Sequence, residues 1–194
     1  MPERSRGNAV NFSLDNEDKE ALLASAREAI TARLEGRTPR WPRCGSACDA
    51  QCGAFVTLHI GKRLRGCIGR MSSNESLRDL VRAMALAAAF EDPRFSPLGK
   101  EELSGIHIEI SALSPLEDCK PEDIAPGTHG AQLSVGWRSG VFLPQVASEQ
   151  GWDREEFLTQ LCYKAGLPAG SQRDPNARLQ RFTAFVFSEE PREP

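Results

Sequence analysis

The stretch 55–69, FVTLHIGKRLRGCIG, is the most informative segment of the sequence, and the other elements can be arranged around it. Val56, Leu58 and Ile60 alternate with more polar residues, and Gly61 then interrupts the alternation. A period of two followed by a glycine is typical of a strand that enters a turn. The segment therefore predicts a β-hairpin.

The register of this hairpin can be predicted from its apolar residues. A loop of three residues, 61–63, would pair Ile60 with Leu64 and keep the apolar side chains on one face, whereas a two-residue loop would mix the faces. Arg65 and Cys67 would then share the opposite face. The residues across the hairpin from them would be His59 and Thr57, and Val56 would face Ile68.

The rest of the chain alternates between helical and strand periodicities. Apolar residues spaced by three and four predict helices, and alternating ones predict strands. Hairpins mixed with helices, without regular βαβ alternation, predict an α+β fold with a mostly antiparallel sheet and flanking helices. The predicted helices are Ser13 to about Glu35, about Glu75 to Phe90, a short one from Pro144, and one capped by Asp153 that reaches Ala165; the further strands are 106–111, 132–135, 141–143 and 182–187.

Composition bounds the class of protein. The chain has 194 residues, of which 40% are hydrophobic and 26% charged, as expected for one globular domain, here 13–187 between polar tails 1–12 and 188–194. A net charge of -3 gives no support for nucleic-acid binding. The apolar stretch 83–90 is too short to span a bilayer, and the N-terminus lacks a signal-peptide core. These features predict a cytoplasmic protein whose six cysteines are thiols.

Cys67 is the strongest candidate for chemistry. Its neighbours Gly66 and Gly69 suggest little crowding around the sulfur, and Arg65 would favour the thiolate, which is both a nucleophile and a metal ligand. The alternative is a small buried hydrophobic side chain, a common role of free cysteine. A cluster of basic residues surrounds this position: Lys62, Arg63, Arg65 and Arg70.

Other candidates carry weaker signals. His129 lies in a glycine-rich loop, where it could act as an acid or base or simply be exposed. Glu109 points away from the apolar face of its strand and could accept a proton or form an ion pair. The spacing of Cys44, Cys48 and Cys52 differs from the C-x-x-C of zinc sites, which favours loop thiols over a disulfide or a metal clip.

Several blocks in order along the chain closely resemble the AMMECR domain family. These are LRGCIG (64–69), AAAFEDPRF (87–95), IEIS (108–111), PGTHG (126–130), GVFLPQVASEQGWD (140–153) and FLTQLCYKAGLP (157–168). Bacterial and archaeal proteins of this kind look like component A of the AmmeMemoRadiSam system, which is associated with a Memo-like protein and a radical SAM protein. The resemblance implies an α+β fold with two unequal subdomains around a cleft that contains LRGCIG.

The resemblance implies candidate site residues, but it assigns no reaction and leaves the cofactor unknown. We expect a cysteine-dependent enzyme or modification factor that acts with the Memo-like and radical SAM partners. The alternatives are a non-catalytic binding or adaptor module for a peptide or anionic ligand, and a regulatory factor in nucleic-acid transactions. The catalytic candidates are Cys67, His129 and Glu109; the ligand-binding candidates are Arg65, Gly66, Gly69, Asp92, Arg94, Gln145 and Lys164; and no metal ligands are predicted.

Overall fold

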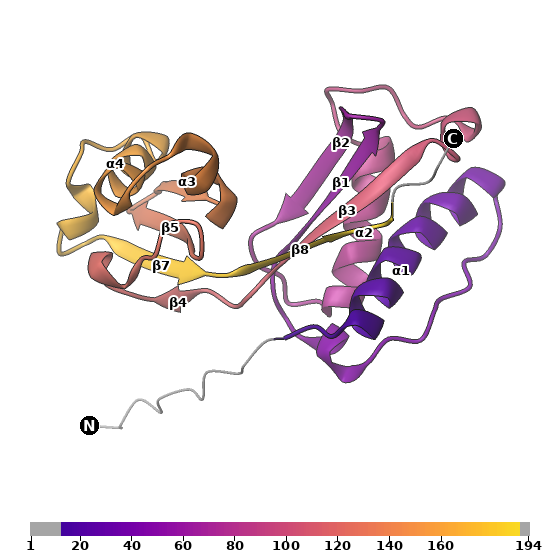
Figure 1. Ribbon diagram of the computed structural model, residues 1–194, viewed down its shortest axis with the longest axis horizontal. Coiled ribbons are helices and arrows are strands. Elements are labelled where there is room, and N and C mark those ends of the chain that lie inside the picture. The colour runs from indigo at the N-terminus through magenta and orange to yellow at the C-terminus, as the bar shows by residue number, and fades with distance from the viewer. Residues whose placement is uncertain (1–12, 191–194) are drawn as a thin grey trace.

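The computed structural model describes residues 13–190, which form an α+β fold with two four-stranded antiparallel sheets (Figure 1). The predicted tail 1–12 and the last residues of the predicted tail 188–194 lie outside the described part. Ser188 ends the last strand, and Glu189 accepts hydrogen bonds from Arg27. These two residues therefore continue the folded domain.

The first sheet has the order β2-β1-β3-β8 and carries both long helices on one face. Side chains of alternate positions on the strands interlock with apolar stripes of the helices, as in a sheet with one covered face. The elements are α1 (Asn16–Glu35), β1 (Ala54–Ile60), β2 (Arg63–Arg70), α2 (Leu77–Phe90), β3 (Ile106–Leu113) and β8 (Ala184–Ser188). Their shared core includes Leu22, Ile30, Val56, Leu58, Leu80, Val81, Ile108 and Ile110.

The second sheet has the order β4-β7-β5-β6 and a separate core. Its elements are β4 (Glu117–Asp118), β5 (Gly130–Val135), β6 (Arg138–Phe142), α3 (Pro144–Gln150), α4 (Arg154–Lys164) and β7 (Arg178–Phe182). Its core includes Ile124, Leu133, Phe157, Leu161 and Leu179. The predicted loop 115–130 therefore contains β4, and β7 was not predicted. We call the parts around the two sheets the first lobe and the second lobe.

Two segments join the lobes side by side (Figure 1). One leads from β3 to β4 and the other from β7 to β8, with a break at Thr183. The amide of Ser114 donates to the Thr183 carbonyl, and the Thr183 amide donates to Ser114 Oγ, both at 2.9 Å. Thr183 thus divides what the sequence predicts as one strand, and it lets the chain pass between sheets. The part of the chain that the structure describes also contains four 3₁₀ helices: η1 (Ser46–Asp49), η2 (Lys100–Glu102), η3 (Pro121–Asp123) and η4 (Ser171–Arg173).

The helix starts follow from capping side chains. Asp153 accepts a hydrogen bond from the amide of Glu156, which confirms its predicted role. The first helix, however, is capped by Asp15 rather than by Ser13, and the second by Ser76. Each of these side chains accepts the amide three residues later, which satisfies one of the free N–H groups of the first turn.

The hairpin register differs from the prediction at its closed end. The turn has two residues, so that Ile60 pairs with Arg63 and His59 with Leu64. A β-bulge then makes Arg65 an extra residue, after which the predicted pairs of Thr57 with Cys67 and of Val56 with Ile68 are confirmed. The bulge corrects the mixing of faces that a two-residue loop would cause. Leu64 lies on the turn side of the bulge and is 38% exposed instead of buried.

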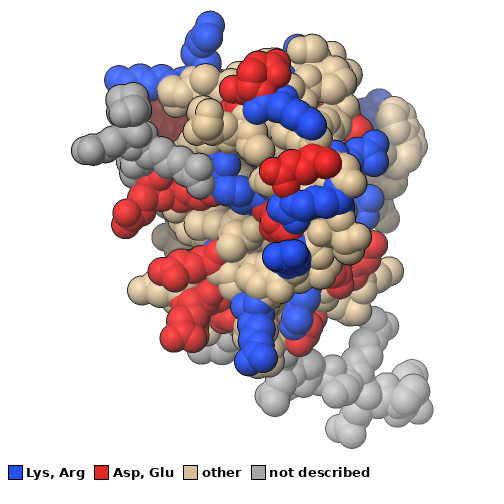
Figure 2. Space-filling model, turned by 90° about the vertical axis from the view of Figure 1, so that its right-hand side faces the viewer, with Lys and Arg blue, Asp and Glu red and all other residues tan. Residues whose placement is uncertain are grey.

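The surface carries no large region of one charge on the face seen in Figure 2, the side on which α1 lies. Basic and acidic side chains alternate across it. Arg37, for example, pairs with both Glu28 and Glu35. Within residues 13–190 no helix is long and apolar enough to cross a membrane.

Candidate functional site

The face of the first sheet opposite the helices carries a row of polar side chains. Cys67 on β2 pairs with Thr57 on β1, which pairs with Glu109 on β3, which in turn pairs with Ser188 on β8. Since residues in register across a sheet point to the same face, these four side chains form one line. Cys67, Thr57 and Glu109 are each half-buried. The row places a thiol, a hydroxyl and a carboxylate in sequence.

Thr57 gives Cys67 a hydrogen bond at the sulfur. The Thr57 Oγ1 hydroxyl donates to Cys67 Sγ over 3.3 Å. A donor in this position stabilises a thiolate more than a neutral thiol, because the bond to an ionised acceptor is the stronger one. The predicted hairpin register placed Thr57 opposite Cys67, and the structure adds the hydrogen bond that makes Thr57 a candidate site residue.

The backbone of Cys67 is fixed by Asp92 and Arg94. The Cys67 amide donates to Asp92 Oδ2 at 2.9 Å, and Arg94 Nη2 donates to the Cys67 carbonyl at 3.2 Å. Because β2 is an edge strand, these groups would otherwise be free to pair with another chain. The aspartate and the arginine occupy the place of a neighbouring strand at this point. Asp92 is buried, whereas the side chain of Arg94 is 54% exposed.

Arg65, the predicted charge partner of Cys67, is directed elsewhere. Its guanidinium donates to both carboxylate oxygens of Glu102, at 2.7 and 2.9 Å, and lies 5.9 Å from the centre of the Phe95 ring. The guanidinium of Arg94 approaches the same ring at 5.5 Å. The bulge is the physical reason, since it removes Arg65 from the alternation that would have placed it beside Cys67. Arg94 takes its place as the cation near the thiol.

These ion pairs shift the pKa values of their acidic members. The hydrogen bond from Arg94 holds the pKa of Asp92 well below its usual range, and the Cys67 amide contributes to the same shift. The hydrogen bond from Arg65 lowers the pKa of Glu102 to about 2. The pKa of Arg94 is raised, first by its hydrogen bond to Asp92 and in smaller part by the charge on Cys67.

Two of the four residues in the predicted basic cluster around Cys67, Arg65 and Arg70, are paired with carboxylates. Arg65 pairs with Glu102, and Arg70 lies 3.4 Å from Glu75. Arg94 pairs with Asp92. The sequence shows the basic residues as neighbours, but their acidic partners come from other segments of the chain.

At Gly66 and Gly69, near Cys67, neighbouring atoms occupy the space that a side chain would take. A Cβ on Gly66 would lie 2.1 Å from the carbonyl oxygen of Ala88, so this glycine lets β2 approach the backbone of α2. A Cβ on Gly69 would lie 2.2 Å from the Phe55 ring, which covers it from the paired strand. The lack of side chains therefore permits close packing and leaves less free space at the sulfur than the sequence suggests. Their predicted role in ligand binding remains a prediction.

Glu109 differs from the other acidic residues of this lobe. The sequence favoured an ion pair for it, but within residues 13–190 its carboxylate has no ion pair and no hydrogen bond. His107 lies two residues earlier on the same strand, and its Nε2 forms a hydrogen bond with the carbonyl oxygen of Glu189 at 2.5 Å. The Glu109 carboxylate is therefore available to accept a proton.

The remaining predicted site residues lie in the second lobe. His129 Nδ1 accepts the amide of Ala125 at 3.1 Å, and burial lowers the pKa of its imidazole, as does the charge of Arg181 to a smaller extent. Lys164 Nζ lies 4.9 Å from the centre of the Phe142 ring, and Gln145 is in the first turn of α3. In the described part of the chain, none of these three makes a hydrogen bond or ion pair with Cys67.

The other cysteines separate into two kinds. Cys44 and Cys48 form a disulfide, which corrects the expectation that all six are thiols, because the turn into η1 brings the two sulfurs together. Cys52, Cys119 and Cys162 are free, and Cys162 donates to Gln172 in the second core. Burial raises the pKa of both Cys52 and Cys119 to about 11.

Two residues of functional interest gave no signal in the sequence. Glu102 lies far along the chain from Arg65, and Asp18, which contacts Cys48, is in the first turn of α1. Both are acidic residues in segments where charged surface residues are ordinary. Only the folded chain shows that they approach the two cysteine regions.

Comparisons with known proteins agree with this architecture. A sequence model of the AMMECR1 family matches residues 23–187. A protein of Methanothermobacter thermautotrophicus is 40% identical over 186 residues, covering 91% of this chain and 97% of that protein. A protein of Thermococcus gammatolerans is 44% identical over 197 residues, covering 94% and 96%. The crystal structure of uncharacterized protein PH0010 from Pyrococcus horikoshii superposes with a TM-score of 0.78 at 36% identity, covering 93% of this chain and 96% of that one.

Proposed function

This chain belongs to the AMMECR1 family, and from that premise we propose that it is a thiol-dependent enzyme or modification factor with Cys67 as its nucleophile. The observation that carries the proposal is the setting of Cys67 Sγ. Cys67 is half-buried, its sulfur accepts a hydrogen bond from Thr57, and Asp92 and Arg94 fix its backbone. A positioned thiolate near a cation is the usual arrangement of a reactive cysteine.

The residues of the row have separate roles in this proposal. The Cys67 sulfur adds to an unsaturated carbon of the substrate, the π electron pair of that carbon moves to the atom bonded to it, and the thiol proton passes to a base. Glu109 is the candidate base, because it lies beyond Thr57 on the same face and has no partner in the described part of the chain. Arg94 supplies a positive charge beside Cys67, since its guanidinium donates to the Cys67 carbonyl.

Contacts in the first lobe weigh against the binding-module alternative. The arginines in the LRGCIG and DPRF segments that such a module would use for an anionic ligand, Arg65 and Arg94, are both paired with carboxylates. A peptide that added a strand to β2 would need the outward N–H and C=O of Cys67, and both are already bonded. The mixed charges on the face seen in Figure 2 also weigh against nucleic-acid binding there.

Alkylation rates test the nucleophile. The protein is treated with iodoacetamide at graded pH, and the labelling of each free cysteine is followed by peptide mass spectrometry. At pH 7 we expect Cys67 to react at least about tenfold faster than Cys119, which burial keeps protonated. Thr57→Val, which keeps the shape but removes the hydroxyl, should slow Cys67 and leave Cys119 unchanged. Labelling of Cys67 no faster than that of a free peptide thiol would contradict the proposal.

The family resemblance further leads us to propose that the protein acts with a Memo-like protein and a radical SAM protein in the cytoplasm. Co-expression with both partners, followed by intact-mass measurement, should give a covalent adduct on Cys67. The adduct should be absent from Cys67→Ser and present in the matched control Cys119→Ser. An unmodified chain under these conditions, together with no co-purification of either partner, would count against the partnership while leaving the alkylation test standing.

A further inference from the structure

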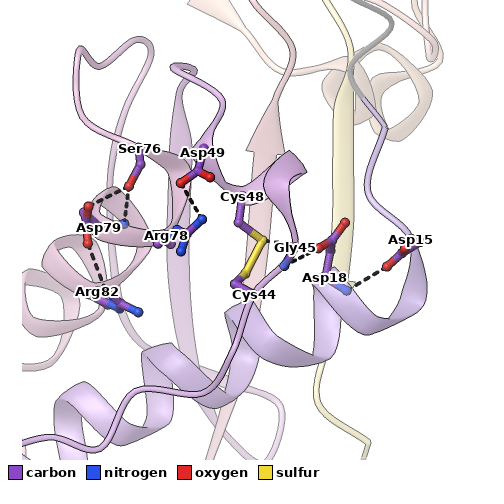
Figure 3. The surroundings of a disulfide bond; sticks show 10 residues. All are labelled: Asp15, Asp18, Cys44, Gly45, Cys48, Asp49, Ser76, Arg78, Asp79 and Arg82. Atoms are coloured by element: carbon purple, nitrogen blue, oxygen red, sulfur yellow. Dashed lines mark hydrogen bonds and ion pairs between the residues drawn. A yellow bond between two sulfur atoms is a disulfide. The ribbon is translucent and has the colours of Figure 1, made fainter.

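A second group of chemistry-bearing side chains lies in the first lobe, at the start of α1. Cys44 and Cys48 flank the entry into η1, and Asp18 faces them from the first turn of the helix (Figure 3). One ligand atom from each residue lies within 4.8 Å of the others. This group is separate from Cys67 and has no part in the proposed function.

We propose that Cys44, Cys48 and Asp18 form a redox-controlled zinc site, in which the disulfide is the closed form and its reduction produces two thiolate ligands beside a carboxylate. The same ligands would suit chemically similar divalent cations. Two cysteines and an oxygen ligand leave a fourth position of a tetrahedral Zn²⁺ for water.

The buried carboxylate of Asp18 is the observation that points to a cation. Asp18 is 6% exposed, and its Oδ1 accepts the amide of Gly45 at 3.1 Å. No lysine, arginine or histidine in residues 13–190 pairs with it. A buried carboxylate without a cation is costly, and the start of α1 offsets only part of that cost. A metal ion would supply the missing positive charge.

Distances around Asp18 fit a zinc site. Sulfur and oxygen ligands of tetrahedral Zn²⁺ lie about 3.6 Å apart, from bond lengths of about 2.3 and 2.1 Å. Asp18 Oδ1 lies 3.6 Å from Cys48 Sγ. A disulfide sulfur carries no proton, so in the oxidised form nothing bridges these two atoms. Reduction supplies a thiol proton there, and a metal ion can replace that proton.

The surroundings are shaped to admit the carboxylate and an ion. A Cβ on residue 45 would lie 2.5 Å from Asp18 Oδ1, so Gly45 between the cysteines makes room for the approach. Figure 3 shows the Asp18 side chain directed at Gly45 and the two sulfurs. A surface recess of about 530 Å³ adjoins the group and gives access from solvent. Asp15 and Glu17 line it beside Asp18, and among the described residues Arg43 is the one cation that lines it.

The chemistry of the switch balances in two steps. A dithiol delivers two electrons and two protons to the Cys44–Cys48 bond, which becomes two thiols while the reductant becomes its own disulfide. Zn²⁺ then binds, and both thiol protons leave to solvent. In a reducing compartment the metal-binding form would predominate.

Zinc titration of the oxidised and reduced protein tests the proposal. The chain is reduced with a dithiol, freed of reductant and metal under nitrogen, and titrated with Zn²⁺ by calorimetry. Co²⁺ serves as the spectroscopic probe, since thiolate ligands give a charge-transfer band. We expect one ion per reduced chain and none per oxidised chain. Equal binding by the two forms, or no binding by the reduced form, would overturn the proposal without requiring any variant.

Variants then identify the ligands. Cys44→Ser and Cys48→Ser should abolish binding and the charge-transfer band. Asp18→Asn should keep the band and weaken binding at least about tenfold. Cys67→Ser and Cys119→Ser are matched controls that should bind as the wild type does, with circular dichroism confirming that each variant is folded. Zinc binding that survives Cys48→Ser, or full affinity in Asp18→Asn, would show a different ligand set.

Discussion

The regions around Cys67 and around Cys48 are built from the same parts. Each places a glycine and a buried aspartate beside a cysteine, and each aspartate accepts a backbone amide, Cys67 N at 2.9 Å for Asp92 and Gly45 N at 3.1 Å for Asp18. The difference is Arg94, which pairs with Asp92 and has no counterpart at Asp18 among residues 13–190. In the first region the charge of Asp92 is balanced by Arg94, whereas in the second the charge of Asp18 has no cationic partner among residues 13–190.

The glycines give the largest expected contrast. In Gly66→Ala the new Cβ would lie 2.1 Å from the backbone oxygen of Ala88, so strand and helix must separate, and we expect a loss of about 3 kcal/mol in the free energy of unfolding. In Gly45→Ala the Cβ meets a side chain, Asp18, which can move. Gly45→Ala should therefore reduce the free energy of unfolding less than Gly66→Ala does, although it moves Asp18 away from Cys48. Urea denaturation measures the free energy of unfolding of both variants.

Gly105→Ala is the control for this pair, because its Cβ would meet its nearest neighbour at an ordinary 3.6 Å. It should leave the free energy of unfolding within about 0.5 kcal/mol of the wild type. A Gly66→Ala protein as stable as Gly105→Ala would show that β2 and α2 are not fixed at this contact.

The aspartates give the second contrast. Asp92→Asn removes the charge that Arg94 pairs with, and it places a donor group where both neighbours also donate. We expect a loss of about 2 kcal/mol, as is typical when charge-assisted hydrogen bonds are left without an acceptor. Asp18→Asn in the oxidised protein removes a charge that has no cation partner, so its loss should be smaller. Equal losses in urea denaturation would mean that Arg94 does not distinguish the two regions.

The sequence predicted much of the first lobe and less of its contacts. Alternation in 55–60 and 106–111 was sufficient for β1 and β3, and it also gave the pairing of Thr57 with Cys67. The bulge at Arg65 could not be predicted, because the apolar Leu64 continues the alternation of Gly66 and Ile68 in the sequence although it lies on the other, exposed face. β7 was missed since its sequence, RLQRF, is largely polar although Gln180 is buried.

The residues that contact the two cysteine regions from distant parts of the chain could not be predicted from the sequence either. Asp18 and Cys48 are 30 residues apart, and Arg65 and Glu102 are 37 apart. Local periodicity describes which face a residue occupies, but it does not describe which distant charge will lie against it. Cys67 as nucleophile stays a prediction, whereas Arg65, predicted as its charge partner, pairs with Glu102, and Arg94 is the arginine that contacts the Cys67 backbone.

The smallest predicted effect is the loss, at acidic pH, of the stability that the ion pair of Arg65 with Glu102 contributes. The pKa of Glu102 is lowered from 4.5 to about 2, so this pair stabilises the protein above pH 4.5 and its contribution is lost as the pH falls toward 2. Because the carboxylate is 27% exposed, we expect Glu102→Gln to lose only about 1 kcal/mol at pH 7. Urea denaturation at stepped pH should show this difference from the wild type shrinking below pH 4.5.

Glu75→Gln is the matched control, since its pair with Arg70 is exposed and should contribute within a few tenths of a kcal/mol at any pH. A difference for Glu102→Gln that stays constant down to pH 2 would assign its effect to packing instead of charge. The same variant also distinguishes the two arginines near the thiol. Loss of Glu102 frees Arg65, so the alkylation rate of Cys67 should stay unchanged if Arg94 is the cation that acts on it, and should rise if Arg65 can take that role.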